Sequence, residues 1–243
     1  MITPKEVRKR IVDISKSSNN PHIPSSLSTV EILLAIYSIK TDKDIFVLSK
    51  GHGCMGWYAI LEDLGYNPPL KHHPDICPKE GIVCTTGSLG HGLPIAVGMA
   101  IAKKILKEAG IIYVLIGDGE CQEGTIWESI SIAVHYELDN IIIIVDNNGI
   151  QALDFVSDVN NDNAQGCTLY DKFESFGCSV VEVDGHNVEE LLLAFTNELP
   201  PLVIIAETIK GKGVKFMENK PEFHAKQLSM SEYEQAYEEL ENA

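Results

Sequence analysis

Two short apolar runs flank a helical pattern near the middle of the chain. Residues 111–116 and 141–145 are rich in β-branched side chains and end at turn residues, which is typical of buried parallel strands. Between them, Ile126, Ile130 and Ala133 recur at helical spacing. This pattern predicts one strand–helix–strand unit.

The same alternation of strands and helices continues on both sides of this unit. Further strands are predicted at residues 44–48, 178–184 and 202–207, and helices at 3–16, 28–36, 57–64, 94–108, 169–176, 188–197 and 229–240. Residues 17–26 and 152–166 are expected to be loops. The alternation predicts an α/β fold, a doubly wound and mainly parallel sheet with helices on both faces. We expect a single domain over residues 1–243 that closes with a C-terminal helix at 229–242.

Capping boxes mark the start of two of these helices. Thr3 is followed by Glu6, and Ser28 is followed by Glu31. In each case we expect the hydroxyl and the carboxylate to bind the free backbone N–H groups of the first turn.

Oxygen-bearing side chains follow both central strands, GDGE at residues 117–120 and DNNG at 146–149. In open parallel sheets, ligands bind beyond the carboxyl ends of the strands, so Asp118 and Asn148 are expected to converge. Their oxygens suit Mg²⁺. Gly117 and Gly119 let the backbone approach a phosphate, and the following helix N-terminus favours negative charge. The residues predict a metal–diphosphate site, with simple turn and cap roles as the alternative.

The sequences of these loops resemble those of one enzyme family. GDG followed about thirty residues later by NN resembles the thiamine diphosphate motif, and GDGECQEG with VDNNGIQ resembles transketolases. The resemblance implies thiamine diphosphate and Mg²⁺, or another divalent cation such as Ca²⁺ or Mn²⁺. It implies that Asp118, Asn148 and the carbonyl oxygen of Ile150 bind the metal, and that Gly117 and Gly119 adjoin the diphosphate.

Three histidines lie in motifs that resemble transketolase segments. His22 begins HIPSSLS, and the resemblance implies that it contacts substrate near the thiazolium ring. His52 belongs to SKGHG, whose histidine contacts the diphosphate in the family. His73 precedes Pro-Asp and matches a histidine that faces the substrate channel.

The later motifs imply further contacts. In TTGSLGHG, the resemblance assigns Gly87, Ser88 and Leu89 to the aminopyrimidine ring, with Leu89 as an apolar wedge. It places His91 opposite the amino group of the cofactor. His224 would contact both the diphosphate and the substrate. His22, His73, His91 and His224 would orient substrate and move protons.

Transketolases carry a second α/β domain that grips the aminopyrimidine and supplies a glutamate, and no such pattern occurs in these residues. The resemblance implies the N-terminal subunit of a split transketolase, in an α2β2 heterotetramer with a separate C-terminal pyrimidine-domain subunit. Glu123 would bridge to the partner's glutamate. The implied reaction transfers a two-carbon ketol unit from a ketose or ketose phosphate to an aldose.

Other functions remain open at this stage. Half of another thiamine diphosphate enzyme, 1-deoxyxylulose-phosphate synthase-like or decarboxylating a 2-oxo acid, is one alternative. A catalytically silent binding subunit is another, although intact Asp118 and Asn148 oppose it. Pro21, Pro24 and His72 stand where the family has glycines, so the sugar stays undefined.

Two other patterns point to unrelated chemistry. Gly51, Gly53 and Gly56 match GxGxxG, but no acidic strand end follows at the distance that a dinucleotide site needs. The cluster of His72, His73, Cys77 and Cys84 matches no standard zinc spacing. We therefore expect neither a nicotinamide site nor a zinc site.

The composition of the chain limits the kinds of molecule that it can bind. The formal net charge of −16 argues against binding nucleic acid or anionic membranes, and no apolar run is long enough to cross a bilayer. The negative net charge also repels phosphorylated ligands, so binding such a ligand needs local cations such as Lys210 and Lys212. The six cysteines form no CxxC pair, and the N-terminus has no apolar signal segment. These features favour a cytoplasmic protein, and the turn at His186 is interpreted as structural.

Overall fold

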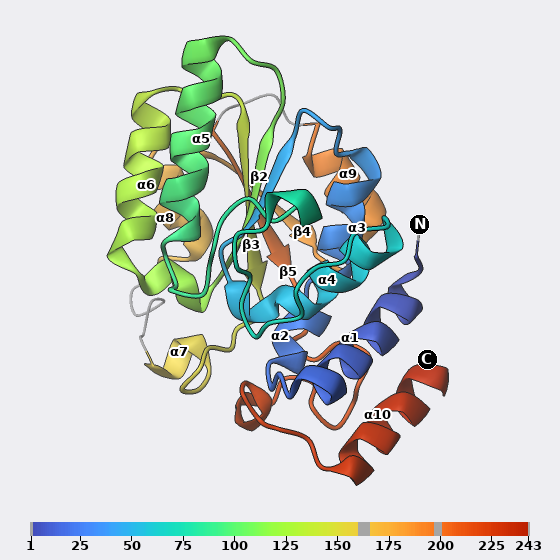
Figure 1. The fold of residues 1–243 in the computed structure, drawn as a ribbon. Coiled ribbons are helices and arrows are strands. Elements are labelled where there is room, and N and C mark those ends of the chain that lie inside the picture. The colour runs from blue at the N-terminus through green and yellow to red at the C-terminus, as the bar shows by residue number, and fades with distance from the viewer. Residues whose placement is uncertain (1, 160–165, 197–200, 243) are drawn as a thin grey trace.

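The computed structural model describes residues 2–159, 166–196 and 201–242. Its centre is a five-stranded parallel sheet in the order β1-β2-β3-β5-β4 (Figure 1). The strands are β1 (Ile45–Leu48), β2 (Ile112–Gly117), β3 (Ile141–Asn147), β4 (Ser179–Asp184) and β5 (Leu202–Glu207). The predicted α/β class with a parallel sheet is confirmed, as is each predicted strand.

Strand side chains alternate between two apolar clusters on opposite faces of the sheet. Val114 and Ile143 point to one face, whereas their neighbours Leu115 and Ile144 point to the other. The first face is covered by α5 (Gly92–Leu106), α6 (Gly124–His135) and α8 (Leu169–Ser175). The second is covered by α3 (Val30–Ile39), α4 (Cys54–Asp63) and α9 (Val188–Ala194), and α1 (Pro4–Ser18) packs against α3 and α4. Burial on both faces explains why the strands are continuous apolar runs.

The connections bring the loops of interest to one edge. β1 reaches β2 through α4 and then α5, β2 reaches β3 through α6, and β3 reaches β4 through a short helix at Val156–Val159 (α7) and then α8. The chain then returns through α9 on the opposite face, which inserts β5 between β3 and β4. Because all five strands are parallel, the loops after β1, β2, β3 and β5 emerge at the same edge. The short α2 (Ile23–Leu27) packs against the loop after β1.

The prediction that residues 17–26 form a loop is wrong. α1 continues to Ser18, and α2 begins at Ile23 with His22 at its N-cap. Pro24 lies in the first turn of α2, where its missing N–H costs nothing. All five residues of α2 are buried, so tertiary packing rather than local propensity stabilises this turn of helix.

The prediction that Ser28 and Glu31 form a capping box is also wrong. α3 begins at Val30 without a side-chain cap. The Glu31 carboxylate instead accepts hydrogen bonds from Arg8 (2.9 Å) and from His186 (3.0 Å) in a buried ion-pair network. The first box is confirmed, with Thr3 and Glu6 capping α1. A buried carboxylate binds an available guanidinium in preference to a backbone amide, because the charged hydrogen bond is stronger. His186 is structural, as expected.

Smaller departures concern element ends. α4 begins at Cys54, earlier than predicted, because a 3₁₀ turn at Gly51–Gly53 leads directly into it. The expected loop at 152–166 contains the short α7 (Val156–Val159), and its residues 160–165 lie outside the described part. Helix α9 ends at Ala194, and Asn197 also lies outside the described part. The C-terminal α10 (Met230–Asn242) packs against α1. No helix in the described ranges is long and apolar enough to span a bilayer.

Two glycines of α5 should respond oppositely to alanine. A Cβ on Gly98, which is exposed inside the helix, would meet no atom within 4 Å. We expect Gly98→Ala to raise the free energy of unfolding by about 1 kcal/mol through helix propensity. A Cβ on Gly92 would lie 2.6 Å from Ser49 Cα, so Gly92→Ala should lower it by about 1–3 kcal/mol. Urea denaturation measures both, and shifts of the same sign would contradict this assignment.

Candidate active site

A cavity of about 190 Å³ opens at the carboxyl ends of the strands. It collects residues from the loops after β1, β2, β3 and β5, together with the residue that caps α2 and the segment before α5. The lining residues are His22, Lys50, His52, His73, Gly87, Leu89, Gly117, Asp118, Gly119, Glu120, Asn148, Ile150, Gln151, Ala152, Lys210 and His224. All but three of the site residues predicted from the sequence therefore lie around one cavity.

The three exceptions lie on the surface. Ser88, His91 and Glu123 are exposed and do not line the cavity. Ser88 and His91 lie in and next to the segment that contributes Gly87 and Leu89 to the wall. Glu123 is the N-cap of α6, and a Cβ on Gly90 would approach its Cβ within 2.8 Å. These residues are accessible to another molecule beside the cavity.

Asp118 joins the two loops that the sequence predicted to converge. Its carboxylate accepts hydrogen bonds from the N–H of Gly119 (2.7 Å) and from the N–H of Gly149, in the loop after β3. The predicted convergence of Asp118 and Asn148 is thus confirmed. Burial, with the neighbouring Asp146 carboxylate, raises the pKa of Asp118 to about 6. A carboxylate in this position would be stabilised by a cation.

Asn148 and Ile150 form the other half of this arrangement. Asn148 Oδ1 accepts a hydrogen bond from Ile150 N–H (3.1 Å), and Asn148 Nδ2 donates to Asp146 (2.9 Å). The Ile150 carbonyl accepts a hydrogen bond from Lys210 Nζ (2.7 Å). Together with Asp118, these groups present carboxylate, amide and carbonyl oxygens, the donor set that hard divalent cations use.

Lys50, which lines the cavity, forms a buried ion pair with Asp146, which does not. Lys50 is 1% exposed and Asp146 is 0% exposed. Asp146 also accepts hydrogen bonds from Ser28 (2.8 Å) and Thr208. Although burial raises the pKa of Asp146, the Lys50 ammonium lowers it overall. Sequence analysis assigned a role to neither residue, although Lys50 lies in SKGHG just after a strand and Asp146 begins DNNG.

Glu120 is a second buried carboxylate that the sequence analysis did not assign. It accepts hydrogen bonds from Ser49 (2.5 Å), from Gly90 N–H (2.8 Å) and from Gly117 N–H (3.1 Å). These bonds connect the loop after β1, the segment before α5 and the end of β2. Glu120 therefore holds together three segments of the cavity wall.

Lys210 is the local cation that the sequence suggested. It is 2% exposed, and its Nζ lies 2.9 Å from His224 Nδ1 as well as against the Ile150 carbonyl. Burial and the nearby Lys50 ammonium lower the pKa of Lys210 to about 7. Lys212 does not line the cavity. Because Lys50 is paired with Asp146, Lys210 is the lysine of the cavity wall that can place positive charge beside an anionic ligand, which would favour its protonated form.

Four histidines gather at the cavity, with neighbouring ring centroids 5.4 to 5.9 Å apart. They are His22, His52, His73 and His224. Burial lowers the pKa of all four, to about 4 for His22 and about 3 for His224. All four rings are therefore neutral near pH 7, and each can offer one nitrogen as donor and one as acceptor.

The glycines of the GxGxxG pattern pack loops together. A Cβ on Gly51 would lie 2.8 Å from Gly87 N, and one on Gly53 would lie 2.8 Å from Ser25 O. A Cβ on Gly56 would similarly lie 3.2 Å from Ser26 O. These contacts explain the three glycines without a nucleotide.

The expectations for the glycines after β2 need one correction. A Cβ on Gly117 would meet no atom closer than 3.9 Å, so its open side suits close approach of a ligand. Gly119 also lines the cavity, and a Cβ there would in addition lie 2.7 Å from Gln151 Cβ. A 3₁₀ turn at Gly119–Gln122 separates it from α6. Contrary to the prediction, the N-terminus of α6, at the exposed Gly124, does not line the cavity.

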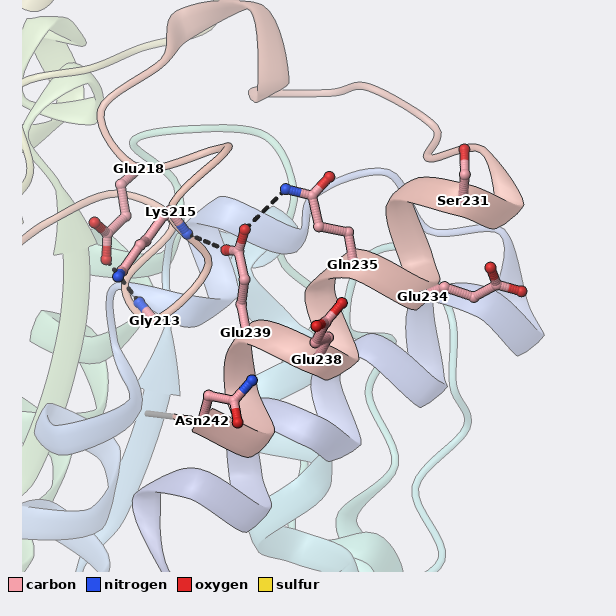
Figure 2. A pocket seen from close by; sticks show the side chains of 9 residues that line it. All are labelled: Gly213, Lys215, Glu218, Ser231, Glu234, Gln235, Glu238, Glu239 and Asn242. Atoms are coloured by element: carbon pink, nitrogen blue, oxygen red, sulfur yellow. Dashed lines mark hydrogen bonds between the residues drawn. The ribbon is translucent and has the colours of Figure 1, made fainter.

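A second hollow of about 770 Å³ lies between α10 and the loop at residues 213–218 (Figure 2). It is open and mostly acidic. Two of its four carboxylates bind neighbouring groups, since Glu239 accepts from Lys215 N–H and Gln235, and Glu218 accepts from Gly213 N–H (2.9 Å). None of its residues belongs to the motifs described above.

Comparison with known proteins decides the family. The family model described as "Transketolase, thiamine diphosphate binding domain" matches residues 37–241. The chain belongs to the transketolase family. An apulose-4-phosphate transketolase subunit from Actinobacillus succinogenes is 38% identical, over 98% of this chain and 94% of its own length. The 6-deoxy-6-sulfo-D-fructose transketolase subunit SqwG of Clostridium sp. is 37% identical, over 90% of this chain and 88% of its own length.

A solved structure and a longer relative agree with this family assignment. Transketolase from Leishmania mexicana superposes with a TM-score of 0.86 at 26% identity and covers 99% of this chain, but only 42% of that structure is matched. Human transketolase is 33% identical over 98% of this chain and 41% of its own length. The chain thus spans about two fifths of these longer transketolases. The comparisons confirm the predicted family, the thiamine diphosphate-binding fold and the transferase reaction class.

Proposed function

We propose that this chain is the diphosphate-binding subunit of a transketolase whose active site is completed by a separate pyrimidine-domain subunit. The observation that supports this proposal most strongly is a single cavity lined by Asp118, Asn148, two buried lysines and four neutral histidines. Two relatives of matching length are named as transketolase subunits. The exposed Ser88, His91 and Glu123 beside the cavity suit contact with that second chain.

The residues present fit the implied cofactor and metal. The oxygens of Asp118, Asn148 and Ile150 would hold Mg²⁺, or Ca²⁺ or Mn²⁺ in its place. The raised pKa of Asp118 reflects a buried acid that a metal ion would return to its charged form. Gly117 would adjoin the diphosphate, with His52 and Lys210 as donors. When bound, thiamine diphosphate supplies the nucleophilic thiazolium carbon that carries a two-carbon ketol unit from ketose to aldose.

The histidines would act on the sugar. His22, His73 and His224 are neutral, so each can hydrogen-bond a hydroxyl or move a proton without a preceding ionisation. His91 would lie against the amino group of the pyrimidine. The backbone of Gly87, Ser88 and Leu89 would hold the ring itself, and Glu123 would meet the partner's glutamate.

We further propose an α2β2 heterotetramer in the cytoplasm. The names of the relatives as subunits support a second chain. None of the six cysteines, all of which lie in the described ranges, forms a disulfide, which is usual in a reducing compartment. Size-exclusion chromatography with light scattering of the mixed subunits tests the stoichiometry.

Calorimetry tests the shared site. We expect thiamine diphosphate with Mg²⁺ to bind weakly or not at all to this chain alone, and to bind clearly once the pyrimidine-domain subunit is added. The reason is that this chain provides only one wall of the cofactor site. Tight binding to this chain alone would contradict a shared site. Absence of binding to the folded mixture would favour a silent subunit.

A donor panel tests the reaction. Apulose 4-phosphate and 6-deoxy-6-sulfo-D-fructose, taken from the names of the relatives, should be compared with xylulose 5-phosphate and with pyruvate. We expect ketol transfer from at least one of the sugars and none from pyruvate. Consumption of pyruvate would favour the synthase-like or decarboxylating alternatives.

A further inference from the structure

Asn20 lies behind His22, in the connection between α1 and α2. Its side chain is buried, with 0% of the residue exposed. Asn20 Oδ1 lies 3.1 Å from the backbone N of His22 and 3.2 Å from His22 Nδ1. On the other side, Asn20 Nδ2 lies 3.4 Å from the carbonyl oxygen of His72 and 3.9 Å from Cys54 Sγ. The amide thus bridges the site histidine and the loop that carries His73.

The partners determine which way the amide faces. The backbone N–H of His22 can only donate, and the His72 carbonyl can only accept. Asn20 Oδ1 must therefore face His22, and Nδ2 must face His72. His22 Nδ1 contacts that same oxygen, so Nδ1 carries the hydrogen. The tautomer of His22 is therefore set by two groups, the His22 N–H and the His72 carbonyl, whose donor and acceptor roles cannot change.

The opposite nitrogen of the ring is open to the cavity. No group in the described residues hydrogen-bonds to His22 Nε2, and the ring lines the cavity. The titratable groups that face the ring are all basic, namely His52, His72, His73, Lys210 and His224. Burial and these groups lower the pKa of His22 to about 4, so the ring stays neutral. A neutral ring with hydrogen on Nδ1 has its lone pair on Nε2.

We propose that Asn20 is a positioning residue that holds His22 as the Nδ1–H tautomer, so that Nε2 accepts a hydrogen bond from a hydroxyl of the sugar substrate. The sugar rests on the proposed function, whereas the tautomer is a property of this chain alone. Pro21, the one residue between Asn20 and His22, restricts the turn that joins them. The proline that departs from the family pattern therefore gains a physical role in this chain.

Nuclear magnetic resonance of the full chain with ¹⁵N-labelled histidine tests the tautomer directly. We expect the His22 signals, assigned by their loss in His22→Gln, to show hydrogen on Nδ1. Asn20→Leu, which removes both polar atoms at similar volume, should mix or reverse the tautomers. Asn20→Asp keeps an acceptor oxygen and should keep the tautomer, and the His72 carbonyl still accepts from Cys54 Sγ (3.4 Å) in that variant.

Kinetics of the complex with its partner subunit, thiamine diphosphate and Mg²⁺ test the consequence. Asn20→Leu should lower kcat/KM for the ketose by roughly tenfold to a hundredfold, without weakening cofactor binding. This loss is at or below the roughly hundredfold that removing the acid–base group itself costs at least, because His22 is still present but less well oriented. In the background of His22→Ala, Asn20→Leu should have little further effect, because both changes remove the same interaction. Asn20→Asp should raise the pKa of His22 and move the acidic limb of the pH profile upward.

Ser18→Ala is the matched control, because Ser18 ends α1 just before this connection and its hydroxyl donates to Ile14 O (2.7 Å) rather than to His22. It should leave tautomer and kinetics unchanged. Hydrogen on Nε2 in the wild-type chain would overturn the proposal, as would additive losses in the double variant. If the wild-type complex transfers no ketol unit while the tautomer is as expected, the proposed function fails and the role of Asn20 in orienting His22 stands.

Discussion

Asp118→Ala should abolish the joint binding of Mg²⁺ and thiamine diphosphate to the complex and reduce turnover by more than about a hundredfold. That factor is the loss typical of a group that only supports a metal ligand, and Asp118 would be a ligand itself. It would be the only carboxylate among the proposed metal ligands, and the Asn148 and Ile150 oxygens carry only partial charges. Calorimetry with Mg²⁺ and the cofactor, followed by a ketol-transfer assay, measures both effects.

Asp139→Ala is the control for this variant, because Asp139 is an exposed aspartate outside the loops that form the cavity. It should leave binding and turnover unchanged. Retention of metal-dependent cofactor binding by Asp118→Ala would contradict the assigned metal site.

Asp118→Ala should also alter the pH dependence of stability in metal-free protein. Because burial raises the pKa of Asp118 to about 6 from its ordinary 3.8, the folded state retains this proton longer than the unfolded state. Asp118 therefore lowers the free energy of unfolding as the pH rises through this window. The wild-type chain should lose more stability than Asp118→Ala between about pH 4 and 6, as urea denaturation without metal would show.

Lys50→Met should lower the free energy of unfolding by about 3–5 kcal/mol, because it leaves the Asp146 carboxylate buried and unpaired. Asp146 is completely buried, and its remaining partners, Ser28, Asn148 and Thr208, donate only neutral hydrogen bonds. The midpoint of urea denaturation measures the loss. Lys50→Met with Asp146→Asn should recover part of it, since the asparagine has no charge to bury.

Lys71→Met is the matched control for this ion pair. Lys71 pairs with Asp75 on the surface, where their side chains are 60% and 48% exposed. We expect a loss below about 1 kcal/mol there, because water screens the charges. Similar losses for Lys50→Met and Lys71→Met would show that the Lys50–Asp146 pair does not stabilise the floor of the cavity.

Much of the architecture followed from local patterns. β2 and β3 are runs of apolar, largely β-branched residues because both faces of a parallel sheet are buried, and that requirement is visible in the sequence. The convergence of Asp118 and Asn148 was predictable for a related reason. Parallel strands end at the same edge, so residues about thirty positions apart meet once strand order is known.

Other features depended on partners distant in the sequence. Glu31 looks like a cap in the sequence, yet it binds Arg8 and His186 because burial makes a charged partner worth more than a backbone amide. His22 became the N-cap of a helix that only packing stabilises. The residue types alone did not show that Ser88, His91 and Glu123 would lie outside the cavity.

The amino-acid sequence by itself determined the strands, the family motifs and most of the residues around the cavity, because each is set by local periodicity or by short spacing. Only the tertiary structure decided how charge is balanced there. Lys50 meets Asp146 across 96 positions, and Lys210 meets Ile150 across 60. The physical reason is that desolvation, which makes these pairings necessary, depends on what surrounds a residue in space rather than on its neighbours in the chain.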